Sequence, residues 1–489
     1  MKIDPHSAWQ ALASRDTRFD GVFYVGVTST GIYCRPVCPV RPPMEANCRF
    51  YSSAEAAEKA GFRPCLRCRP ELAPGNAPMD NAQRVASRVI QRLDESLTTQ
   101  AQSLEALAAD LGLSLRQLRR IVHQELGVTP LELRQTRRLL LAKQLLTETS
   151  LPVTEIAFAS GFSSLRRFNH VFRTQYRLSP SQLRKNAATG MQKSGTDSSQ
   201  LLLSWRPPFD WTALLDFLHL RSLAGVEWVD MDAQTYSRTV RIGQNRGWIR
   251  VANQAQKNAL QIEFSHSLTP VLPALLRRLR HLFDLNAQPQ SIAEVLERDE
   301  RLHASLALNP GLRVPGAFDG FELAIRAILG QQITVKAATT LGSRFVQAFG
   351  EPLETPFNEL NRLAPEPEIV VQATQDEICQ LGIISTRARS IQSIASACLN
   401  GDVTFDGRHN AEETVERLQA LPGIGPWTAQ YIAMRALNWP DAFPREDIVI
   451  RNNLGGVTAK QAEEISRQWQ PWRSYAVMHI WKNLTPVKR

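Results

Sequence analysis

The stretch LPGIGPWTAQYIA, residues 421–433, decides the fold of the C-terminal part of this chain. It predicts two short helices joined by a hairpin that contains Gly423 and Gly425. Glycine lets a backbone approach another molecule closely, and the free N–H groups that open a helix bind anions. A nucleic-acid phosphate can therefore bind at Gly423 and Gly425 without a basic side chain. The alternative is a plain helical hairpin with a glycine C-cap.

A single carboxylate follows this hairpin. Asp447 stands in PREDIVIR (444–451), a short loop downstream, with Arg451 four residues later. A carboxylate beside a docked nucleic-acid backbone can act on a sugar. The combination predicts an enzyme that holds DNA by its backbone, whereas a surface aspartate after an ordinary hairpin is the alternative.

The length and charge of the chain limit the possible classes. A chain of 489 residues is too long for one hydrophobic core and predicts about three or four domains. Its net charge is +10, and residues 81–186 contain 16 Lys and Arg against 8 Asp and Glu. Such a concentration of positive charge favours a nucleic-acid partner over a merely solvated surface.

No apolar run approaches the roughly 20 residues that span a bilayer, and the N-terminal sequence MKIDPHSAWQ lacks a signal-peptide core. We therefore expect a cytoplasmic, nucleoid-associated protein with no membrane partner. In that compartment the seven cysteines are not expected to form disulfides, and clustered cysteines are expected to hold metal or carry out chemistry.

Four cysteines form two close pairs, Cys34-x3-Cys38 and Cys65-x2-Cys68. Each pair can place two sulfurs on one metal ion, and four thiolates suit tetrahedral zinc. We expect one zinc ion bound by all four, with a purely structural zinc site in a small domain as the alternative.

The sequences GVTSTGIYCRPVCPVRP (26–42) and GFRPCLRCRP (61–70) resemble the zinc domain of Ada-type alkylation-response proteins. The resemblance implies that Cys34 irreversibly accepts a methyl group from a methylphosphotriester in DNA. Loss of one negative charge at the site would then strengthen DNA binding by nearby arginines, among them Arg35, Arg41 and Arg67, and so create a damage sensor.

The basic region predicts two helix-turn-helix units. SLEALAADLGLSLRQLRRIVHQ (103–124) has serine caps and a turn at Gly112, and PVTEIAFASGFSSLRRFNHVFRTQY (152–176) repeats the scheme with a turn at Gly161. The polar faces of the second helices carry side chains that read base edges in the major groove: Arg116, Gln117, Arg120, Arg166, Arg167 and Asn169.

The tandem units, joined by a long helix around 129–146, resemble the AraC-type DNA-binding domain, most distinctively in IAFASGFSSLRRFNHVFR. This resemblance implies promoter binding, with RNA polymerase as a further partner, whereas a helical connector is the alternative. NAATGMQKSGTDSSQ (186–200) is small and polar and predicts a flexible tether.

After this tether the alternating sequence at 236–265 predicts sheet strands, and from about residue 286 the pattern is helical. Residues 201–489 resemble AlkA-type 3-methyladenine DNA glycosylases of the helix-hairpin-helix superfamily. WRPPFDW, FELAIRAILGQQITVKAA (321–338), LPGIGPWTAQYIAMRAL (421–437) and WQPWRSYAVMHIW (469–481) carry the resemblance.

That resemblance implies extrusion of an alkylated nucleotide and hydrolysis of its N-glycosidic bond. Asp447 matches the catalytic carboxylate through the spacing Asp-x3-Arg, and we prefer it to the adjacent Glu446.

Base-binding aromatic residues are expected at Trp427, Tyr431, Trp481 and Phe217, where cation–π attraction of about 0.5–2 kcal/mol each favours a cationic base. Ordinary core aromatic residues are the alternative. Gln332 or Ile333 is expected to wedge into the duplex.

Trp427 occupies the position at which bifunctional members of the superfamily carry a Schiff-base lysine, so strand cleavage is not expected. No cysteine follows Cys398, and so we do not expect an iron–sulfur cluster. We also expect no organic cofactor. No Pro-Cys-His-Arg motif occurs, and the O6-alkylguanine methyltransferase domain of longer Ada proteins is therefore expected to be absent.

The sequence as a whole predicts a multidomain, mainly α protein with α+β modules. We expect it to act as a monomer on double-stranded DNA. Two rival hypotheses are a regulator whose glycosylase half only binds DNA, and an enzyme whose N-terminal half only tethers it. The predicted parts are a zinc domain (1–78), a tandem helix-turn-helix domain (82–186), a linker (187–200), a small α+β sheet module (201–285) and an all-α helix-hairpin-helix glycosylase domain (286–489).

Overall fold

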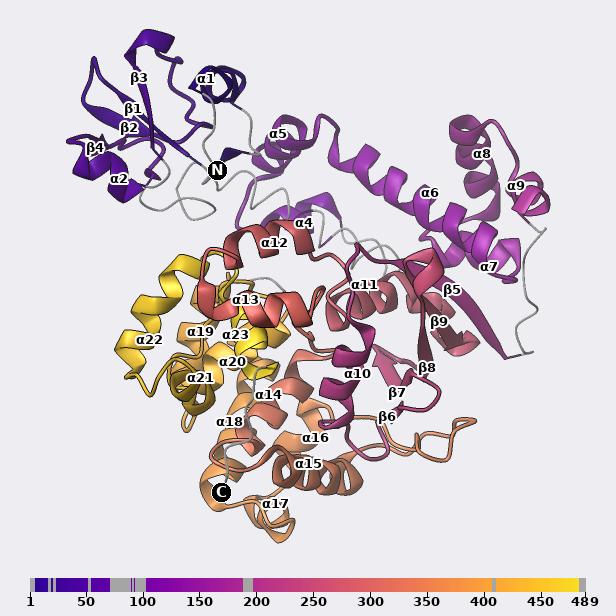
Figure 1. Cartoon of the computed structure of the whole chain (residues 1–489). Helices are drawn as coiled ribbons and strands as arrows, with labels where there is room; N and C mark the ends of the chain where they lie inside the picture. The colour runs from indigo at the N-terminus through magenta and orange to yellow at the C-terminus, as the bar shows by residue number, and fades with distance from the viewer. Residues whose placement is uncertain are drawn as a thin grey trace. The chain divides into compact units, whose positions relative to one another are not determined.

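The computed structural model describes residues 5–15, 19–20, 23–51, 54–70, 89, 92, 103–187, 197–406 and 410–482. These residues form two compact units, and the break between them falls at Leu133 and Arg134, inside helix α6 (Pro130–Glu148). Each unit is described separately below (Figure 1). No helix among the described residues is both long and apolar enough to cross a membrane.

The first unit begins with a small sheet in which the strand order is β3-β1-β2-β4. Strand β1 pairs antiparallel with β2 and β3, whereas β2 and β4 are parallel. The elements of this part are α1 (Pro5–Ser14), β1 (Tyr24–Val27), β2 (Ile32–Cys34), η2 (Glu45–Asn47), β3 (Cys48–Tyr51), α2 (Ala54–Lys59) and β4 (Arg63–Pro64). Its apolar clusters are small, as expected for a domain of this size.

Two capped helices complete the first unit. Ser103 caps α4 (Leu104–Asp110), and Ser114 forms a capping box with Gln117 at the start of α5 (Leu115–Leu126). Gly112, in the turn, has a positive φ of 65°, which glycine adopts without strain. The helices, caps and turn predicted for 103–124 are therefore confirmed.

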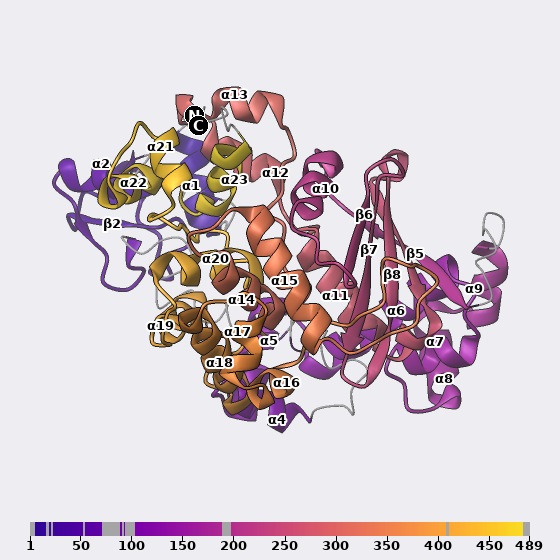
Figure 2. The same ribbon diagram turned by 90° about the horizontal axis from the view of Figure 1, so that it is seen from below.

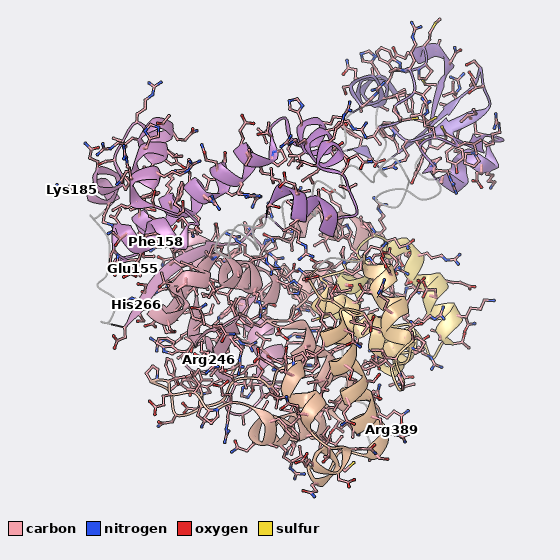
Figure 3. All side chains as sticks on the ribbon, turned by 180° about the vertical axis from the view of Figure 1, so that it is seen from behind. Glu155, Phe158, Lys185, Arg246, His266 and Arg389 are labelled. Atoms are coloured by element: carbon pink, nitrogen blue, oxygen red, sulfur yellow. The ribbon has the colours of Figure 1, made fainter. Side chains whose placement is uncertain are left out.

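The second unit begins with the rest of α6, followed by α7 (Val153–Ala159), α8 (Leu165–Tyr176) and α9 (Pro180–Ala187). Ser164 caps α8, and Gly161 occupies the turn with a φ of 80°. Phe168 and Phe172 on α8 are fully buried in the core of this unit. Glu155 and Phe158 on α7 and Lys185 on α9 are exposed (Figure 3).

A five-stranded antiparallel sheet follows, with the order β5-β9-β8-β7-β6 (Figure 2). Its strands are β5 (Ser198–Ser204), β6 (Glu227–Asp230), β7 (Thr235–Ile242), β8 (Asn245–Gln254) and β9 (Ala259–Ser265), and its other elements are α10 (Trp211–His219), η6 (Ala255–Lys257), η7 (His266–Val271) and α11 (Leu272–Leu282). Strand β5 starts at Ser198, so the last three residues of the predicted linker belong to the sheet because their backbones pair with β9. Residues 188–196 of that linker lie outside the described residues.

Two side chains of α6 hydrogen-bond the backbone of Leu202 on the edge strand β5. The amide of Gln144 donates to the carbonyl of Leu202 at 2.8 Å, and the Leu202 N–H donates to Glu148 at 2.9 Å. An unpaired strand edge is a template for unwanted pairing, and these two side chains stand where a neighbouring strand's backbone would otherwise pair.

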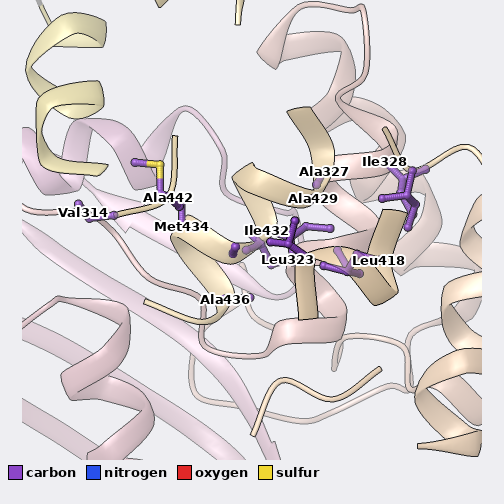
Figure 4. Close-up of a cluster of buried hydrophobic side chains, with 14 of the residues drawn as sticks. Val314, Leu323, Ala327, Ile328, Leu418, Ala429, Ile432, Met434, Ala436 and Ala442 are labelled. Atoms are coloured by element: carbon purple, nitrogen blue, oxygen red, sulfur yellow. The ribbon is translucent and has the colours of Figure 1, made fainter. Parts of the chain in front are cut away.

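The remaining residues form the helical domain, whose buried core joins α14 to α20 and α18 (Figure 4). Leu323, Ala327 and Ile328 of α14 and Ala429 and Ile432 of α20 belong to this core. The helices are α12 (Pro289–Leu296), α13 (Glu300–Leu308), α14 (Gly320–Leu329), α15 (Val335–Phe349), α16 (Pro367–Gln372), α17 (Gln375–Gln380), α18 (Ser385–Asn400), α19 (Ala411–Gln419), α20 (Pro426–Ala436), α21 (Ile448–Asn453), α22 (Ala459–Ser466), η8 (Arg467–Trp469) and α23 (Arg473–Lys482).

Candidate functional site

The hairpin predicted from LPGIG joins α19 to α20. Gly423 has a φ of 77°, and a Cβ atom at this position would lie 2.1 Å from the Ser390 hydroxyl, so a side chain cannot be accommodated without rearrangement. Gly425 is the N-cap of α20 and has open space where a Cβ would lie. No side chain caps this helix start, which leaves its first N–H groups available to an anion.

Asp447 is the N-cap of α21. Its Oδ1 accepts hydrogen bonds of 3.0 Å from the N–H groups of both Val449 and Ile450. Its Oδ2 accepts a 2.9 Å hydrogen bond from the indole of Trp427, and the indole of Trp481 lies 3.5 Å from Oδ1. These donors fix the orientation of the carboxylate.

Glu446 has a different environment. Its Oε1 pairs with Arg445 at 3.0 Å, and its side chain is absent from the lining of the cavity that contains Asp447. Of these two neighbouring carboxylates, only Asp447 lines the cavity.

The cavity beside Asp447 has a volume of about 600 Å³. All four aromatic residues expected to bind a base line it. Trp427 and Tyr431 are stacked with their ring centres 5.3 Å apart, and Trp481 lies 6.3 Å from Tyr431. Phe217 reaches the cavity from α10, so the small α+β module contributes one wall.

Sequence reasoning missed the other charged residues that line this cavity, namely Asp216, Arg221, Arg326, Arg435 and Lys482. Arg435 lies four residues after Tyr431 on α20, so helical spacing could have indicated it. Arg221 lies in the turn after α10, and helical spacing gives no signal for it. Arg326 forms ion pairs with Glu227 and Glu322.

These ion pairs belong to a buried network between the sheet and α14. Arg238 pairs with Glu322 at 2.8 Å and lies 3.8 Å from Glu227. Burial acts to raise the pKa of Glu322, but Arg238 and Arg326 outweigh it and lower this pKa to about 2. The network keeps the carboxylate ionised and fixes the wall of the cavity that Arg326 lines.

The loop after α14 carries the two wedge candidates. Gln332 is exposed and has a positive φ of 54°, whereas Ile333 is half-buried and lines the cavity. Gln331 fastens this loop to the hairpin, because its amide donates to the Gly423 carbonyl at 2.9 Å and to the Thr428 hydroxyl at 3.0 Å.

The four predicted metal ligands come together in the zinc domain. Their sulfur atoms all lie within 4.8 Å of one another, and thiolates bound to one zinc ion at about 2.3 Å would lie about 3.8 Å apart. Cys34 ends β2 and Cys65 directly follows its parallel neighbour β4, so the sheet itself brings the two pairs together. The hydrogen bond between Cys34 and Cys38 raises the pKa of Cys34 and lowers that of Cys38. This donor set fits zinc.

The structure does not support the expected contact between Arg35 and DNA. Its side chain is only 1% exposed, pairs with Asp20 and donates to the Cys68 carbonyl at 3.5 Å, so it is a structural residue of the metal site rather than a DNA contact. Its backbone N–H donates to the Cys68 sulfur at 3.4 Å. Arg41 and Arg67 are exposed, as a DNA contact requires.

The polar faces of α5 and α8 have the exposure expected of recognition helices. Five of the six predicted residues are exposed (Arg116, Gln117, Arg120, Arg166 and Arg167), and Asn169 is half-buried.

Family models match four segments of the chain. They are described as the metal binding domain of Ada (residues 7–71), a helix-turn-helix domain (107–186), the AlkA N-terminal domain (200–319) and the HhH-GPD superfamily of base excision DNA repair proteins (325–474). These matches define the class: a helix-hairpin-helix base excision repair protein joined to an Ada-type metal-binding domain and a helix-turn-helix domain.

The probable bifunctional transcriptional activator/DNA repair enzyme AlkA of Mycobacterium tuberculosis is 36% identical over 490 residues, which cover 99% of this chain and 97% of that relative. The chain belongs to this family, and the resemblances and fold class expected from the sequence are confirmed. DNA-3-methyladenine glycosylase 2 of Escherichia coli is 36% identical over 279 residues, or 57% of this chain and 95% of that protein. The solved 3-methyladenine DNA-glycosylase of Archaeoglobus fulgidus shares the fold at 20% identity, with a TM-score of 0.50 over 57% of this chain and 96% of its own.

Proposed function

We propose that this protein is a monofunctional DNA glycosylase that hydrolyses the N-glycosidic bond of alkylated bases of the 3-methyladenine type, fused to a methylphosphotriester sensor and a promoter-binding domain. One observation carries the proposal most directly: Asp447 lines an aromatic cavity and is held by two backbone N–H groups and by the indole of Trp427. Trp427 stands at the start of α20, next to the hairpin suited to a DNA phosphate.

The catalytic role of Asp447 follows from its hydrogen bonds. As the bond to an alkylated base breaks, positive charge develops on the sugar, and a fixed carboxylate stabilises that charge without reorganisation. Water attacks the sugar and replaces the base, which leaves with the bonding electrons. A cationic base needs little acid catalysis, and Trp427 offers no amine for an imine, which is why the proposed enzyme is monofunctional.

DNA is held by two elements beside the cavity. The N–H groups at the start of α20 receive a backbone phosphate near Gly423 and Gly425. Gln332 fills the space left by the extruded nucleotide, since it is the exposed member of the pair of wedge candidates. Trp427, Tyr431, Trp481 and Phe217 enclose the base.

In the zinc domain, Cys34 is the proposed methyl acceptor. Cys34, Cys38, Cys65 and Cys68 would hold the zinc ion, which would keep their sulfurs as thiolates at neutral pH. The Cys34 sulfur attacks the methyl carbon of a methylphosphotriester, the carbon–oxygen bond breaks, and the phosphate regains its negative charge. Arg41 and Arg67 then bind neighbouring phosphates more strongly. Cys34 is half-buried, whereas the other three ligands are buried, which supports its choice as the acceptor.

The regulatory part is proposed to bind promoter DNA through the polar faces of α5 and α8 and to contact RNA polymerase. We further propose the five-part division predicted from the sequence, with β5 extending the α+β module back to Ser198, and a cytoplasmic monomer with one zinc ion and no organic cofactor or iron–sulfur cluster.

One assay on the purified protein tests both chemical proposals. On alkylated duplex DNA, the protein should release free bases, and Asp447→Asn should lower the rate at least 1,000-fold, roughly the loss of 4 kcal/mol of transition-state stabilisation. Glu446→Gln is the matched control and should stay within about twofold. Mass spectrometry should find one added methyl on Cys34. A protein that releases no base would be a regulator that only binds DNA, and an unmodified Cys34 would leave the N-terminal half as a tether.

A further inference from the structure

Two guanidinium groups meet at one end of the base cavity. The Arg221 Cζ lies 3.8 Å from the centre of the Phe217 ring, and the Arg435 Cζ lies 4.8 Å from the same centre. Arg435 also donates a 2.8 Å hydrogen bond to the Tyr431 hydroxyl. All four residues line the cavity that contains Asp447.

These two charges are not neutralised by acidic partners. Among the described residues, no ion pair joins a carboxylate to Arg221 or Arg435, whereas Arg326 nearby has Glu227 and Glu322. Backbone carbonyls accept the other hydrogen bonds of the two arginines: those of Pro315 and Gly316 from Arg435, and that of Phe217 from Arg221. Carbonyl oxygens satisfy the N–H groups, but they leave both positive charges in place.

The two guanidinium groups and the Tyr431 hydroxyl place donors at this end of the cavity, whose lining also includes the carboxylates of Asp216 and Asp447. A guanidinium group has no acceptor, and the Tyr431 oxygen already accepts from Arg435, so its hydrogen remains for a ligand. Burial acts to raise the pKa of Tyr431, but the charges of Arg435 and Arg221 outweigh it and lower this pKa. The hydroxyl is therefore a stronger donor than an ordinary tyrosine.

We propose that Arg221 and the Tyr431 hydroxyl determine which bases the cavity favours: neutral bases that present oxygen or nitrogen acceptors bind well, whereas cationic bases bind poorly. The inference rests on the proposed glycosylase function and deepens it. Repulsion between like charges a few ångströms apart in a poorly hydrated cavity opposes the cation–π attraction of the aromatic walls. Cationic bases then leave because their glycosidic bonds are weak, and not because this cavity selects them.

The test compares two leaving bases under single-turnover conditions with the full-length protein. One substrate contains 7-methylguanine, whose nucleoside is cationic, and the other contains hypoxanthine, which is neutral and presents acceptors. Arg221→Gln removes the charge and should raise the ratio of cationic to neutral release at least tenfold. Arg221→Lys keeps the charge and should leave this ratio within threefold of the original protein.

Tyr431→Phe supplies an independent measurement, because it keeps the ring and removes only the hydroxyl. It should lower hypoxanthine release about tenfold and change 7-methylguanine release less than threefold. Arg246→Gln makes the same charge change as Arg221→Gln on β8, outside the cavity lining, and should change neither rate (Figure 3).

The outcomes separate this inference from the proposed function. If the original protein releases neither base, the glycosylase proposal itself fails. If it releases both, and Arg221→Gln and Tyr431→Phe alter the two rates equally, then both residues are merely structural and the inference is overturned. Thermal unfolding of each variant identifies any that does not fold, and Tyr431→Phe decides the question if Arg221→Gln is one of them.

Discussion

The indole nitrogen of Trp427 donates a 2.9 Å hydrogen bond to Oδ2 of Asp447. Trp427 is the second residue of α20, and Asp447 caps α21, so this bond ties the hairpin proposed to bind DNA to the carboxylate proposed to act on the sugar. A residue expected only to stack on a base thus also orients the proposed catalytic carboxylate.

Replacing Trp427 by Phe should therefore impair catalysis more than the loss of ring area alone predicts. A hydrogen bond to a charged group contributes about 1.5–3 kcal/mol, so base release should slow by about 10- to 150-fold. Trp481→Phe is the matched control, because its indole lies 3.5 Å from the carboxylate and should contribute less. Single-turnover release of 7-methylguanine measures both variants. Equal losses in the two would mean that the Trp427 hydrogen bond has no special role.

The two hairpin glycines should respond differently to alanine. Gly423→Ala places a Cβ on a backbone with positive φ and against Ser390, so the variant should lose at least about 1–2 kcal/mol of stability and unfold at a lower temperature. Gly425 has a φ of −86° and open space around it, so Gly425→Ala should fold normally. Its new methyl group should nonetheless weaken duplex DNA binding, because a phosphate must approach the backbone there. Normal DNA affinity in folded Gly425→Ala would contradict this reading of the hairpin.

Features fixed by a few neighbouring residues were predictable from the sequence. The serine caps of α4, α5 and α8, the turns at Gly112 and Gly161, and the paired cysteines all depend on short spacings. Such signals do not depend on the rest of the fold.

Features that depend on contacts between distant segments were not predictable. Arg35 looked like a DNA contact because its charge is visible in the sequence, whereas its pairing with Asp20 exists only in the folded domain. The cationic end of the base cavity likewise combines α10 with α20, which are separated by about two hundred residues. The positive φ of Gln332 is a third example, since nothing in GQQIT requires it.

The stability of the helical domain should fall in acid because of His479. This side chain is 4% exposed, and burial lowers its pKa from 6.5 to about 4. The unfolded chain therefore binds more protons between these values, and stability falls as pH drops from about 6.5 towards 4, by up to about 3 kcal/mol.

His479→Asn, which keeps a polar group near the Ser305 hydroxyl but does not titrate, should flatten this dependence. The exposed His303→Asn is the control and should leave the slope unchanged. Urea unfolding at several pH values measures both. An unchanged slope in His479→Asn would assign the acid sensitivity to other groups.

Gln332 holds a backbone conformation that costs a non-glycine residue about 1 kcal/mol or more. This cost is offset because Arg387 donates to the Gln331 carbonyl and the Gln331 amide donates to the hairpin, so the loop is held with Gln332 at its exposed tip.

A residue that fills the space of an extruded nucleotide is needed only in a duplex. Gln332→Ala should thus slow base release from duplex DNA about tenfold, yet change release from the same single-stranded oligonucleotide less than twofold. Ile333→Ala should slow both substrates alike, because Ile333 lines the base cavity. If Gln332→Ala instead impaired the single-stranded substrate equally, its role would be to support the cavity, and the wedge would have to be sought elsewhere.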